Sequence, residues 1–403
     1  MRLHRNLTDA VIEGLGMIFN DNHYADKVVE KQLKKDKRWG ARDRAFIAET
    51  TYEIVRWKRL YAEIAEVKQP FSVQDLRRMF AVWAVLKGIS LPDWSYFENT
   101  PQRRIKGKFD ELSKVRKFRE SVPDWLDVLG EEELGNDFWT RELRALNELA
   151  PVVLRSNTLK ISPPQLKSLL QQEGIETRLL ENYPEALELS ERANVFSTKA
   201  FSNGLFEVQD ASSQKVAPFL EVTSGMRVID TCAGAGGKTL HLASLMKNKG
   251  QIIAMDIYEN KLQELKRRAR RNEVFNVETK LIDPKQLKRM QNTADRVLID
   301  APCSGLGVLR RNPDAKWKLK PEFLEQIRKT QQEILQNYSK LVKSGGKLVY
   351  ATCSILPSEN RKQVDEFLKS EAGKGFVFEA EDKIFAHQSG YDGFYMARMR
   401  KNN

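Results

Sequence analysis

The stretch Met226-Arg-Val-Ile-Asp230-Thr-Cys-Ala-Gly234-Ala-Gly236-Gly237-Lys238-Thr239 joins a short apolar strand to the start of a helix through a glycine-rich turn. The missing side chains of such a turn let a ligand approach the backbone. The turn is not a P-loop, because Cys232 stands where that motif requires its first glycine. It is not the dinucleotide fingerprint either, since the third glycine is residue 237 and not residue 239. The stretch therefore predicts the start of an α/β sheet whose ligand has no diphosphate.

The chain after about residue 207 alternates strand-like and helix-like runs. The strand-like runs are Met226–Asp230, Gln251–Asp256, Val277–Ile282, Arg296–Asp300 and Lys347–Ala351. The helix-like runs are Lys238–Met246, Tyr258–Asn272, Pro284–Gln291 and Pro321–Lys343. Right-handed crossovers make such a chain a parallel, doubly wound sheet. Two more strands, Gly375–Glu379 and Gly393–Met399, come last, and we expect a mostly parallel α/β sheet with its final strand reversed.

Two regions with other patterns of apolar residues precede this part of the chain. Before about residue 150 the chain reads as helical, because apolar residues such as Leu7, Val11 and Leu15 recur at helical spacing. The next region combines two strand-like runs and one helix-like run: Val152–Lys160, Ser162–Glu173 and Gly174–Leu180. A length of 403 residues fits two or three domains of about 150 residues each. The predicted domains are an all-helical one over 1–150, a small α+β (RRM- or ferredoxin-like) subdomain over 151–206 and the doubly wound one over 207–403.

The chain is basic, with 67 Lys and Arg against 55 Asp and Glu and a net charge of +12. Such a balance predicts a polyanionic partner, and it favours a nucleic acid over a membrane surface. Cations crowd the helical region at 34, 35, 37, 38, 42, 44, 56, 58 and 59 and again at 103, 104, 106, 108, 114, 116, 117 and 119. Aromatic residues lie among them, as in surfaces that bind phosphates and stack on bases. The alternative for each residue is a solvated face with aromatic rings in the core.

Neither a secretory leader nor a membrane span is expected. The N-terminus lacks an apolar segment before its first acidic residue. The longest strongly apolar run, Met79–Leu86, is far shorter than the ~20 residues that cross a bilayer. We therefore expect a cytoplasmic protein without a membrane partner, and a monomer.

Cysteine and histidine usage argues against a metal site. The chain has three cysteines, Cys232, Cys303 and Cys353. Their odd number and wide spacing argue against a disulfide framework and against a zinc knuckle. The four histidines are scattered along the chain. We expect no metal.

Aspartates end three of the predicted strands and suggest the ligand. Asp256 ends the second strand, where a carboxylate binds ribose hydroxyls in nucleotide-binding sheets. Asp283 follows the third strand and could reach an adenine amino group. With the glycine turn after Asp230, these residues indicate a nucleoside without a diphosphate, and S-adenosylmethionine is the obvious candidate. The alternative for each aspartate is an ordinary turn residue at the end of a strand.

Two cysteines follow neighbouring strands of the predicted sheet. Asp300 and Cys303 follow the fourth strand, and Thr352-Cys353-Ser354 follows the fifth, so both thiols should lie at one edge of the ligand pocket. A thiolate that adds to C6 of a pyrimidine makes C5 nucleophilic enough to accept a methyl group. A second group must then assist loss of the C5 proton, and an aspartate could hold the base. From the residues alone either cysteine could attack, and a structural or regulatory thiol pair is the alternative.

Three motifs in this order carry a family resemblance. Asp230-x-Cys-Ala-Gly-Ala-Gly-Gly-Lys-Thr, Asp300-Ala-Pro-Cys-Ser-Gly and Thr352-Cys-Ser resemble the RsmB/NOL1/NOP2/Sun family of RNA 5-methylcytosine methyltransferases. The last strand, with Tyr391-Asp-Gly-Phe-Tyr-Met-Ala-Arg, is similar to the end of that family. The resemblance covers about residues 150–400 and implies a Rossmann-like class I methyltransferase fold.

The resemblance implies roles for individual residues. Cys353 would be the nucleophile, Cys303 would aid proton removal or product release, and Asp300 would contact the cytosine. The residues implied for S-adenosylmethionine are Cys232, Ala233, Gly234, Ala235, Gly236, Gly237, Lys238, Asp256, Lys261, Asp283 and Asp300. Lys261 stands where the family often has arginine, which keeps the charge without the bidentate geometry. The implied RNA-facing residues are Arg310, Arg311, Lys316, Trp317 and Lys318.

The helical region bears a second resemblance. The segment from Arg42 to Lys58 is similar to the NusB-like RNA-binding domain of the bacterial 16S ribosomal RNA enzyme. This similarity favours ribosomal RNA over transfer RNA as the substrate. The alternatives are a transfer RNA cytosine-C5 methyltransferase and a non-catalytic RNA-binding factor of ribosome assembly.

Overall fold

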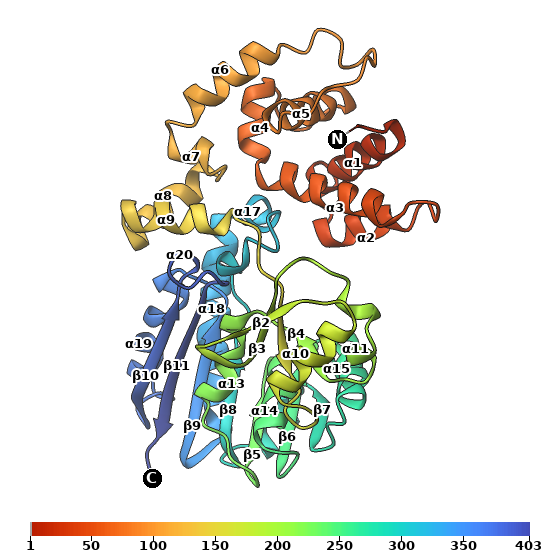
Figure 1. Cartoon of the computed structure of the whole chain (residues 1–403). Helices are drawn as coiled ribbons and strands as arrows, with labels where there is room; N and C mark the ends of the chain where they lie inside the picture. Colours follow the sequence, from red (N-terminus) through yellow and green to blue (C-terminus); the bar gives the residue numbers. More distant parts are fainter. Residues whose placement is uncertain (1) are drawn as a thin grey trace. The chain divides into compact units, whose positions relative to one another are not determined.

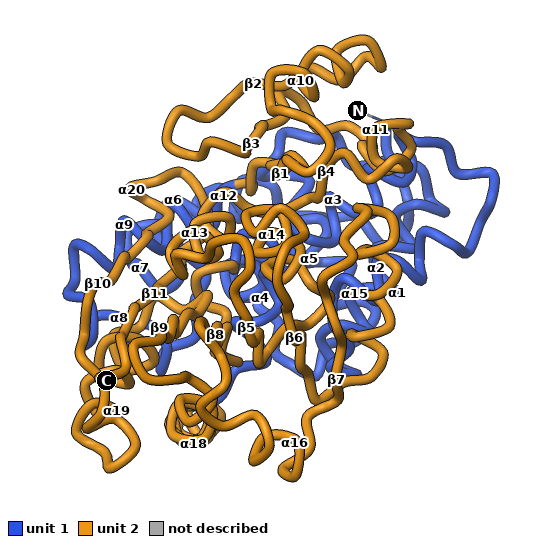
Figure 2. The backbone as a smooth tube through the Cα atoms, turned by 90° about the horizontal axis from the view of Figure 1, so that it is seen from below, with its two compact units in different colours: residues 1–148, 309–320 blue, residues 149–308, 321–403 orange. Residues whose placement is uncertain are grey.

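The structure, a computed structural model, describes residues 2–403 and divides them into two compact units (Figures 1 and 2). The helical unit consists of the residues up to Glu148 together with an insertion, residues 309–320. The sheet unit consists of residues 149–308 and 321–403. The insertion lies between two elements of the sheet unit in sequence, but its contacts are with the helices.

The helical unit is built from amphipathic helices. They are α1 (Arg5–Phe19), α2 (Ala25–Leu33), α3 (Ala41–Arg56), α4 (Lys58–Ala65), α5 (Val73–Leu86), α6 (Gln102–Leu112), α7 (Arg116–Arg119), α8 (Asp124–Leu134), α9 (Asn136–Leu146) and α17 (Ala315–Lys318). The apolar stripe of α1 is buried, as its 3.6-residue spacing requires. Ser72 caps α5, accepting a hydrogen bond from Asp75 N at 3.1 Å while the Asp75 carboxylate accepts from Ser72 N at 2.9 Å. None of the helices that the structure describes is long and apolar enough to cross a membrane.

A four-stranded sheet opens the sheet unit. Its strands β1 (Val153–Ser156), β2 (Thr177–Leu180), β3 (Tyr183–Leu189) and β4 (Phe206–Val208) pair antiparallel in the order β2-β3-β1-β4. Helices α10 (Pro163–Gln172) and α11 (Lys199–Ser202) accompany it. Leu154, Leu166 and Phe206 belong to its core. The sequence pattern does not predict β3. This strand contains Pro184, Glu185 and Glu188, which are residue types depleted in strands.

The large sheet has seven strands in the order β10-β11-β9-β8-β5-β6-β7, running from left to right in Figure 1. They are β5 (Arg227–Asp230), β6 (Gln251–Asp256), β7 (Val277–Leu281), β8 (Ala294–Asp300), β9 (Val342–Thr352), β10 (Phe376–Ile384) and β11 (Phe394–Lys401). The strands from β5 to β9 pair in parallel, while β11 pairs antiparallel with both of its neighbours. The predicted Rossmann-like sheet with a reversed last strand is confirmed.

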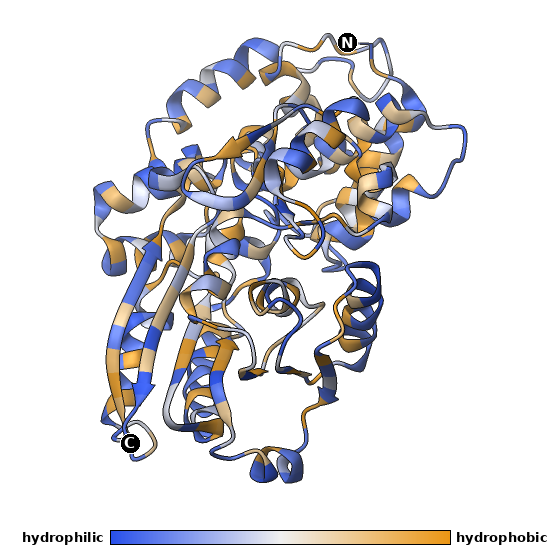
Figure 3. Ribbon diagram, turned by 60° about the horizontal axis from the view of Figure 1, so that its bottom comes forward, coloured by the Kyte–Doolittle hydropathy of each residue, from blue (hydrophilic) through white to orange (hydrophobic). Residues whose placement is uncertain are grey.

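Helices cover both faces of this sheet. They are α12 (Ala211–Gln214), α13 (Val216–Phe219), α14 (Gly237–Leu245), α15 (Glu259–Arg271), α16 (Pro284–Arg289), α18 (Pro321–Tyr338), α19 (Arg361–Lys369) and α20 (Ala386–Ser389). Successive residues point to opposite faces, so Val228 packs in one hydrophobic cluster and Ile229 in the other. In Figure 3 hydrophobic colour follows the strands, whereas the outer faces of the helices are hydrophilic.

Helix α18 is shorter than the sequence predicts. The pattern predicts a helix as far as Lys343, but α18 ends at Tyr338 and β9 begins at Val342. Asn292 N and Thr293 N donate to the carbonyls of Lys340 and Leu341, at 2.9 and 3.1 Å. Pairing with the segment that leads into β8 thus draws these residues out of the helix.

The order of the strands reverses at β5, which pairs with β6 on one side and β8 on the other. A ligand site is expected at the carboxyl edge beside such a switch point. The strands deliver Asp230, Asp256, Asp300 and Thr352 to that edge.

Alanine substitutions at two glycines inside helices of the helical unit should have opposite effects on stability, one through helix propensity and the other through packing. At Gly107 in α6 an added Cβ would meet nothing within 4 Å, so Gly107→Ala should raise the free energy of unfolding by about 0.5–1 kcal/mol. At Gly130 in α8 it would lie 2.6 Å from Cζ2 of buried Trp139, so Gly130→Ala should lower that free energy by about 1–3 kcal/mol. Urea unfolding followed by tryptophan fluorescence measures both. Stabilisation by Gly130→Ala would contradict the packing of α8 against α9.

Candidate active site

The glycine turn between β5 and α14 is folded over the end of β6. Gly234 N donates to Asp256 Oδ2 at 2.8 Å, and Ala233 N donates to Met255 O at 2.9 Å. Gly236 has φ 89°, and a Cβ there would lie 2.6 Å from Leu265 Cγ. The turn therefore requires glycine at residue 236 both for its backbone angle and for its contact with α15.

Helix α15 also supports the turn through Arg268, a residue that sequence reasoning missed. Its guanidinium donates to Ala235 O at 2.7 Å and to Glu207 Oε2 at 2.9 Å. Glu207, at the middle of β4, is buried and also accepts from Asn272 at 2.5 Å. The only signal in the sequence is the run of arginines in α15, which alone does not indicate a contact with the turn.

The aspartate that ends β6 is held by the backbone. Asp256 is 9% exposed, and its second oxygen, Oδ1, accepts from Tyr258 N at 2.9 Å. Ile257 and Tyr258 are exposed beside it, and Lys261 lies exposed in the first turn of α15. Asp283 caps α16, accepting from Lys285 N at 2.9 Å.

A half-buried ion pair joins the start of α14 to the end of β8. Lys238 Nζ bonds Asp300 Oδ2 at 2.7 Å. Burial lowers the pKa of Lys238, but the charge and hydrogen bond of Asp300 outweigh it and the pKa is raised. The charge of Cys353 acts on Lys238 in the same direction. The ammonium group therefore stays charged close to the Cys353 sulfur.

Asp230 differs from the other aspartates because it is fully enclosed. Thr239 Oγ1 donates to Asp230 Oδ2 at 2.7 Å. Burial raises the pKa of Asp230 to about 7, partly offset by this hydrogen bond and reinforced by the charge of Asp300. Asp230 thus supports the start of α14 and is poorly suited to carry a charge.

The loops after β8 and β9 bring two cysteines into contact. The distance between Cys303 Sγ and Cys353 Sγ is 3.3 Å, and both thiols are free and half-buried. The hydrogen bond with Cys353 raises the pKa of Cys303 well above its ordinary value, and burial adds to the shift. Burial likewise raises the pKa of Cys232 in the glycine turn. Cys303 and Cys232 are therefore thiols at neutral pH.

A buried glutamate that sequence reasoning missed joins the two cysteine loops. Glu359 is fully buried and accepts hydrogen bonds from Ser304 N at 2.8 Å and from Ser354 Oγ at 2.7 Å. Each serine directly follows one of the cysteines. The sequence offered no signal for this residue, because a lone glutamate beyond Pro357 reads as a surface turn.

The predicted RNA-facing residues lie in the insertion of the helical unit. Arg310 and Lys316 are buried, with Arg310 Nε donating to Ala145 O at 2.9 Å. Burial lowers the pKa of Lys316 well below its ordinary value, and the charge of Arg56 adds to this effect. Arg310 and Lys316 thus pack within the helical unit, and their contact with RNA stays a prediction.

The other three predicted RNA-facing residues, Arg311, Trp317 and Lys318, are half-buried. Trp317 Nε1 donates to Val55 O at 2.7 Å, and Lys318 Nζ donates to His23 O at 2.9 Å. The polar groups of Trp317 and Lys318 therefore hold the insertion against α3 and the loop after α1.

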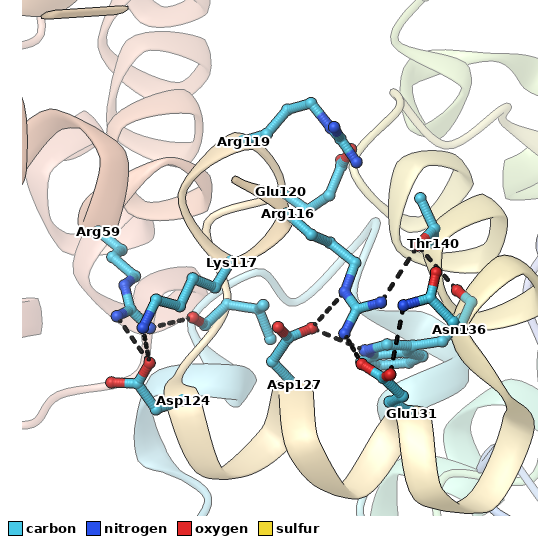
Figure 4. A network of polar contacts seen from close by, with 12 residues as sticks. Arg59, Arg116, Lys117, Arg119, Glu120, Asp124, Asp127, Glu131, Asn136 and Thr140 are labelled. Carbon is cyan, nitrogen blue, oxygen red and sulfur yellow. Dashed lines mark hydrogen bonds and ion pairs between the residues drawn. The ribbon is translucent and has the colours of Figure 1, made fainter. Parts of the chain in front are cut away.

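Part of the second basic cluster is neutralised within the helical unit (Figure 4). Arg116 Nε lies 2.8 Å from Asp127 Oδ1, and Lys117 Nζ lies 2.8 Å from Asp124 Oδ1. Arg119 pairs with the adjacent glutamate at 2.9 Å. Arg116 and Lys117 thus join α7 to α8, and all three paired cations are less available to an external phosphate than the net charge suggests.

Comparisons with known proteins point to one family. The family model described as 16S rRNA methyltransferase RsmB/F matches residues 217–400, and one for an RsmF/B-like ferredoxin-like domain matches residues 122–196. The probable ribosomal RNA small subunit methyltransferase B of Bacillus subtilis is 33% identical, over 98% of this chain and 99% of that protein. The counterpart from Synechocystis is 31% identical, over 94% and 95%.

Solved structures agree in fold. The crystal structure of PH0851 has a TM-score of 0.84 and 25% identity and covers 100% of both chains. A methyltransferase homologue from Pyrococcus horikoshii has a TM-score of 0.63 and 26% identity, covering 71% of this chain and 97% of its own.

The raised pKa of Asp230 predicts a pH dependence of stability. An acid whose pKa is higher in the folded state stabilises the fold below its ordinary value of 3.8, and that stability is lost as the pH rises towards 7. We expect Asp230→Asn, which stays neutral and can still accept from Thr239, to flatten this fall between pH 4 and 7. Urea unfolding at several pH values measures it. Identical slopes in both proteins would contradict a protonated, buried Asp230.

Proposed function

Because the chain belongs to the RsmB/F family of 16S rRNA methyltransferases, we propose that it methylates C5 of a cytosine in 16S ribosomal RNA, with S-adenosylmethionine as methyl donor. The observation that supports this chemistry best is the 3.3 Å separation of Cys303 Sγ and Cys353 Sγ beside the glycine turn. One thiolate can attack C6 while a second sulfur acts on C5.

The carboxyl edge of the large sheet suits S-adenosylmethionine. An added Cβ at Gly234 would meet nothing within 4 Å, so open space lies above the turn. Asp256 is positioned by two backbone N–H groups and keeps lone pairs for ribose hydroxyls. The exposed side chain of Ile257, 62% accessible, offers an apolar surface to a purine. The bound donor would supply an electrophilic methyl group on a sulfonium.

Cys353 is assigned as the nucleophile. Its thiolate forms a bond to C6 of the cytosine, and the displaced electron pair passes through the ring towards N3 and O2. The ion pair of Lys238 and Asp300 lies beside this sulfur and can position the base and balance the developing charge. C5 would then take the methyl group as the bond from that methyl to the donor's sulfonium sulfur breaks, which leaves a neutral thioether. Loss of the C5 proton then expels the Cys353 thiolate from C6.

Cys303 is assigned to removal of the C5 proton. In the free protein the hydrogen bond with Cys353 is the largest cause of its raised pKa. Addition of the Cys353 sulfur to the base removes that hydrogen bond and the sulfur's charge. Cys303 can then release its own proton to solvent more easily, and the resulting thiolate accepts the proton from C5.

RNA binding is assigned to the helical unit. Exposed cations such as Arg42, Arg103 and Lys106 would contact phosphates, and their number would set the salt dependence of binding. The similarity of the Arg42–Lys58 segment to a NusB-like domain supports this assignment.

The two cysteines should give different phenotypes. Cys353→Ala should lower methyl transfer to 16S ribosomal RNA by at least about 10⁴-fold, since the nucleophile is gone. Cys303→Ala should accumulate a covalent protein–RNA complex, because the adduct forms but does not resolve. Denaturing gels and tritium transfer from labelled S-adenosylmethionine measure the two effects. Undiminished transfer by Cys353→Ala would contradict the mechanism.

The substrate can be tested in cells. Bisulfite sequencing should show one cytosine of 16S ribosomal RNA that loses protection when the gene is deleted and regains it on complementation. Loss of protection in a transfer RNA instead would favour the transfer RNA alternative. Unchanged protection in both RNAs, with RNA binding intact, would favour a non-catalytic assembly factor.

A further inference from the structure

The carboxylate of Glu359 lies in the interior beneath the two cysteine loops. It follows Cys353 in the chain, at the end of the 3-10 turn Pro357–Glu359, and is fully buried. Its Oε2 accepts from Ser304 N at 2.8 Å and from Gln331 Nε2 at 3.2 Å, and its Oε1 accepts from Ser354 Oγ at 2.7 Å. Both carboxylate oxygens are thus engaged, by the loop after β8, the loop after β9 and α18.

The serine that follows each cysteine extends this connection. Ser304 Oγ donates to Ser354 Oγ at 3.2 Å, and Ser354 Oγ donates its own proton to Glu359. Each hydroxyl has one proton, so the direction of the chain from Ser304 through Ser354 to the carboxylate is fixed. The two loops are therefore joined twice, once directly between the hydroxyls and once through Glu359.

A buried carboxylate is costly unless several donors satisfy it, and packing alone does not account for one. The three donors that contact the Glu359 carboxylate are neutral, so none of them cancels its negative charge. That charge is one of the causes that raise the pKa of Cys303, after the hydrogen bond with Cys353, burial and the charge of Cys353. The carboxylate therefore acts on the thiol pair both by position and by charge.

We infer that Glu359 is a positioning residue that sets the spacing of the two cysteine sulfurs and keeps the proton of the pair on Cys303. The inference rests on the proposed function for its catalytic consequence. Glu359 touches neither substrate nor sulfur in this account and acts through the serines next to the two cysteines.

The first test measures catalysis in the full-length protein. Glu359→Gln keeps the size of the side chain but replaces one acceptor oxygen with a donor, and it should lower the single-turnover rate by about 100-fold, as displaced reacting groups do. The affinity for S-adenosylmethionine, measured by calorimetry, should stay unchanged. Glu359→Asp, which keeps the charge and both acceptors, should recover part of the rate.

Gln332→Ala is the matched control. Gln332 is buried in α18 and donates to Gln363 Oε1 and O, both at 2.8 Å, so it joins α18 to α19 without contacting either cysteine loop. We expect it to lower the melting temperature but to retain the single-turnover rate. A rate loss in Gln332→Ala equal to that in Glu359→Gln, at equal loss of melting temperature, would overturn the inference.

The second test needs no RNA. Alkylation by iodoacetamide, resolved by mass spectrometry at each cysteine, should show Cys303 reacting only at high pH in the parent protein. In Glu359→Gln the profile of Cys303 should move to lower pH, because a negative charge has been removed. An unmoved profile would overturn the inference. If the parent protein fails to methylate 16S ribosomal RNA, the proposed function fails, while this profile still decides whether Glu359 controls the thiols.

Discussion

The contact between Cys303 and Cys353 is the constraint around which the sheet unit is arranged. The cysteines are far apart in sequence, and their sulfurs meet at 3.3 Å because β8 and β9 are parallel neighbours whose carboxyl ends share one edge. Asp300 pairs with Ala351 in the register of these strands, so the two loops leave the sheet side by side. A change of one residue in that register would move the sulfurs apart.

The charges around this contact differ between the two sulfurs, which suits the two cysteines to different roles. Lys238, fixed by Asp300, brings positive charge close to Cys353, whereas the carboxylate of Glu359 acts on Cys303 from beneath. Asp230 is enclosed under the glycine turn, and burial raises its pKa to about 7. Its carboxyl group therefore contributes less negative charge than an exposed aspartate would. Two chemically identical thiols thus experience different surroundings, which suits a reaction that needs a nucleophile and a separate acceptor of a proton.

The sequence was informative where a pattern is local. The strands from β5 to β9 and the glycine turn follow from apolar runs, glycines and terminal aspartates, and the predicted fold is confirmed. It was uninformative where a role depends on contacts between distant segments. Glu359 and Arg268 act through such contacts, and Lys316 is buried by helices far away in the chain. The same limit applies to single members of the basic clusters, since a cation such as Arg116 pairs inside the unit.

We propose that Cys353, and not Cys303, forms the bond to the base, and trapping of the adduct tests this assignment most directly. The substrate is RNA whose target cytosine carries fluorine in place of hydrogen at C5. Because no proton can then leave C5, the methylated covalent adduct persists. Digestion of the trapped complex and mass spectrometry identify the modified cysteine. We expect the nucleotide on the peptide that contains Cys353. Attachment to the peptide that contains Cys303 would contradict the assignment of Cys353 as the nucleophile.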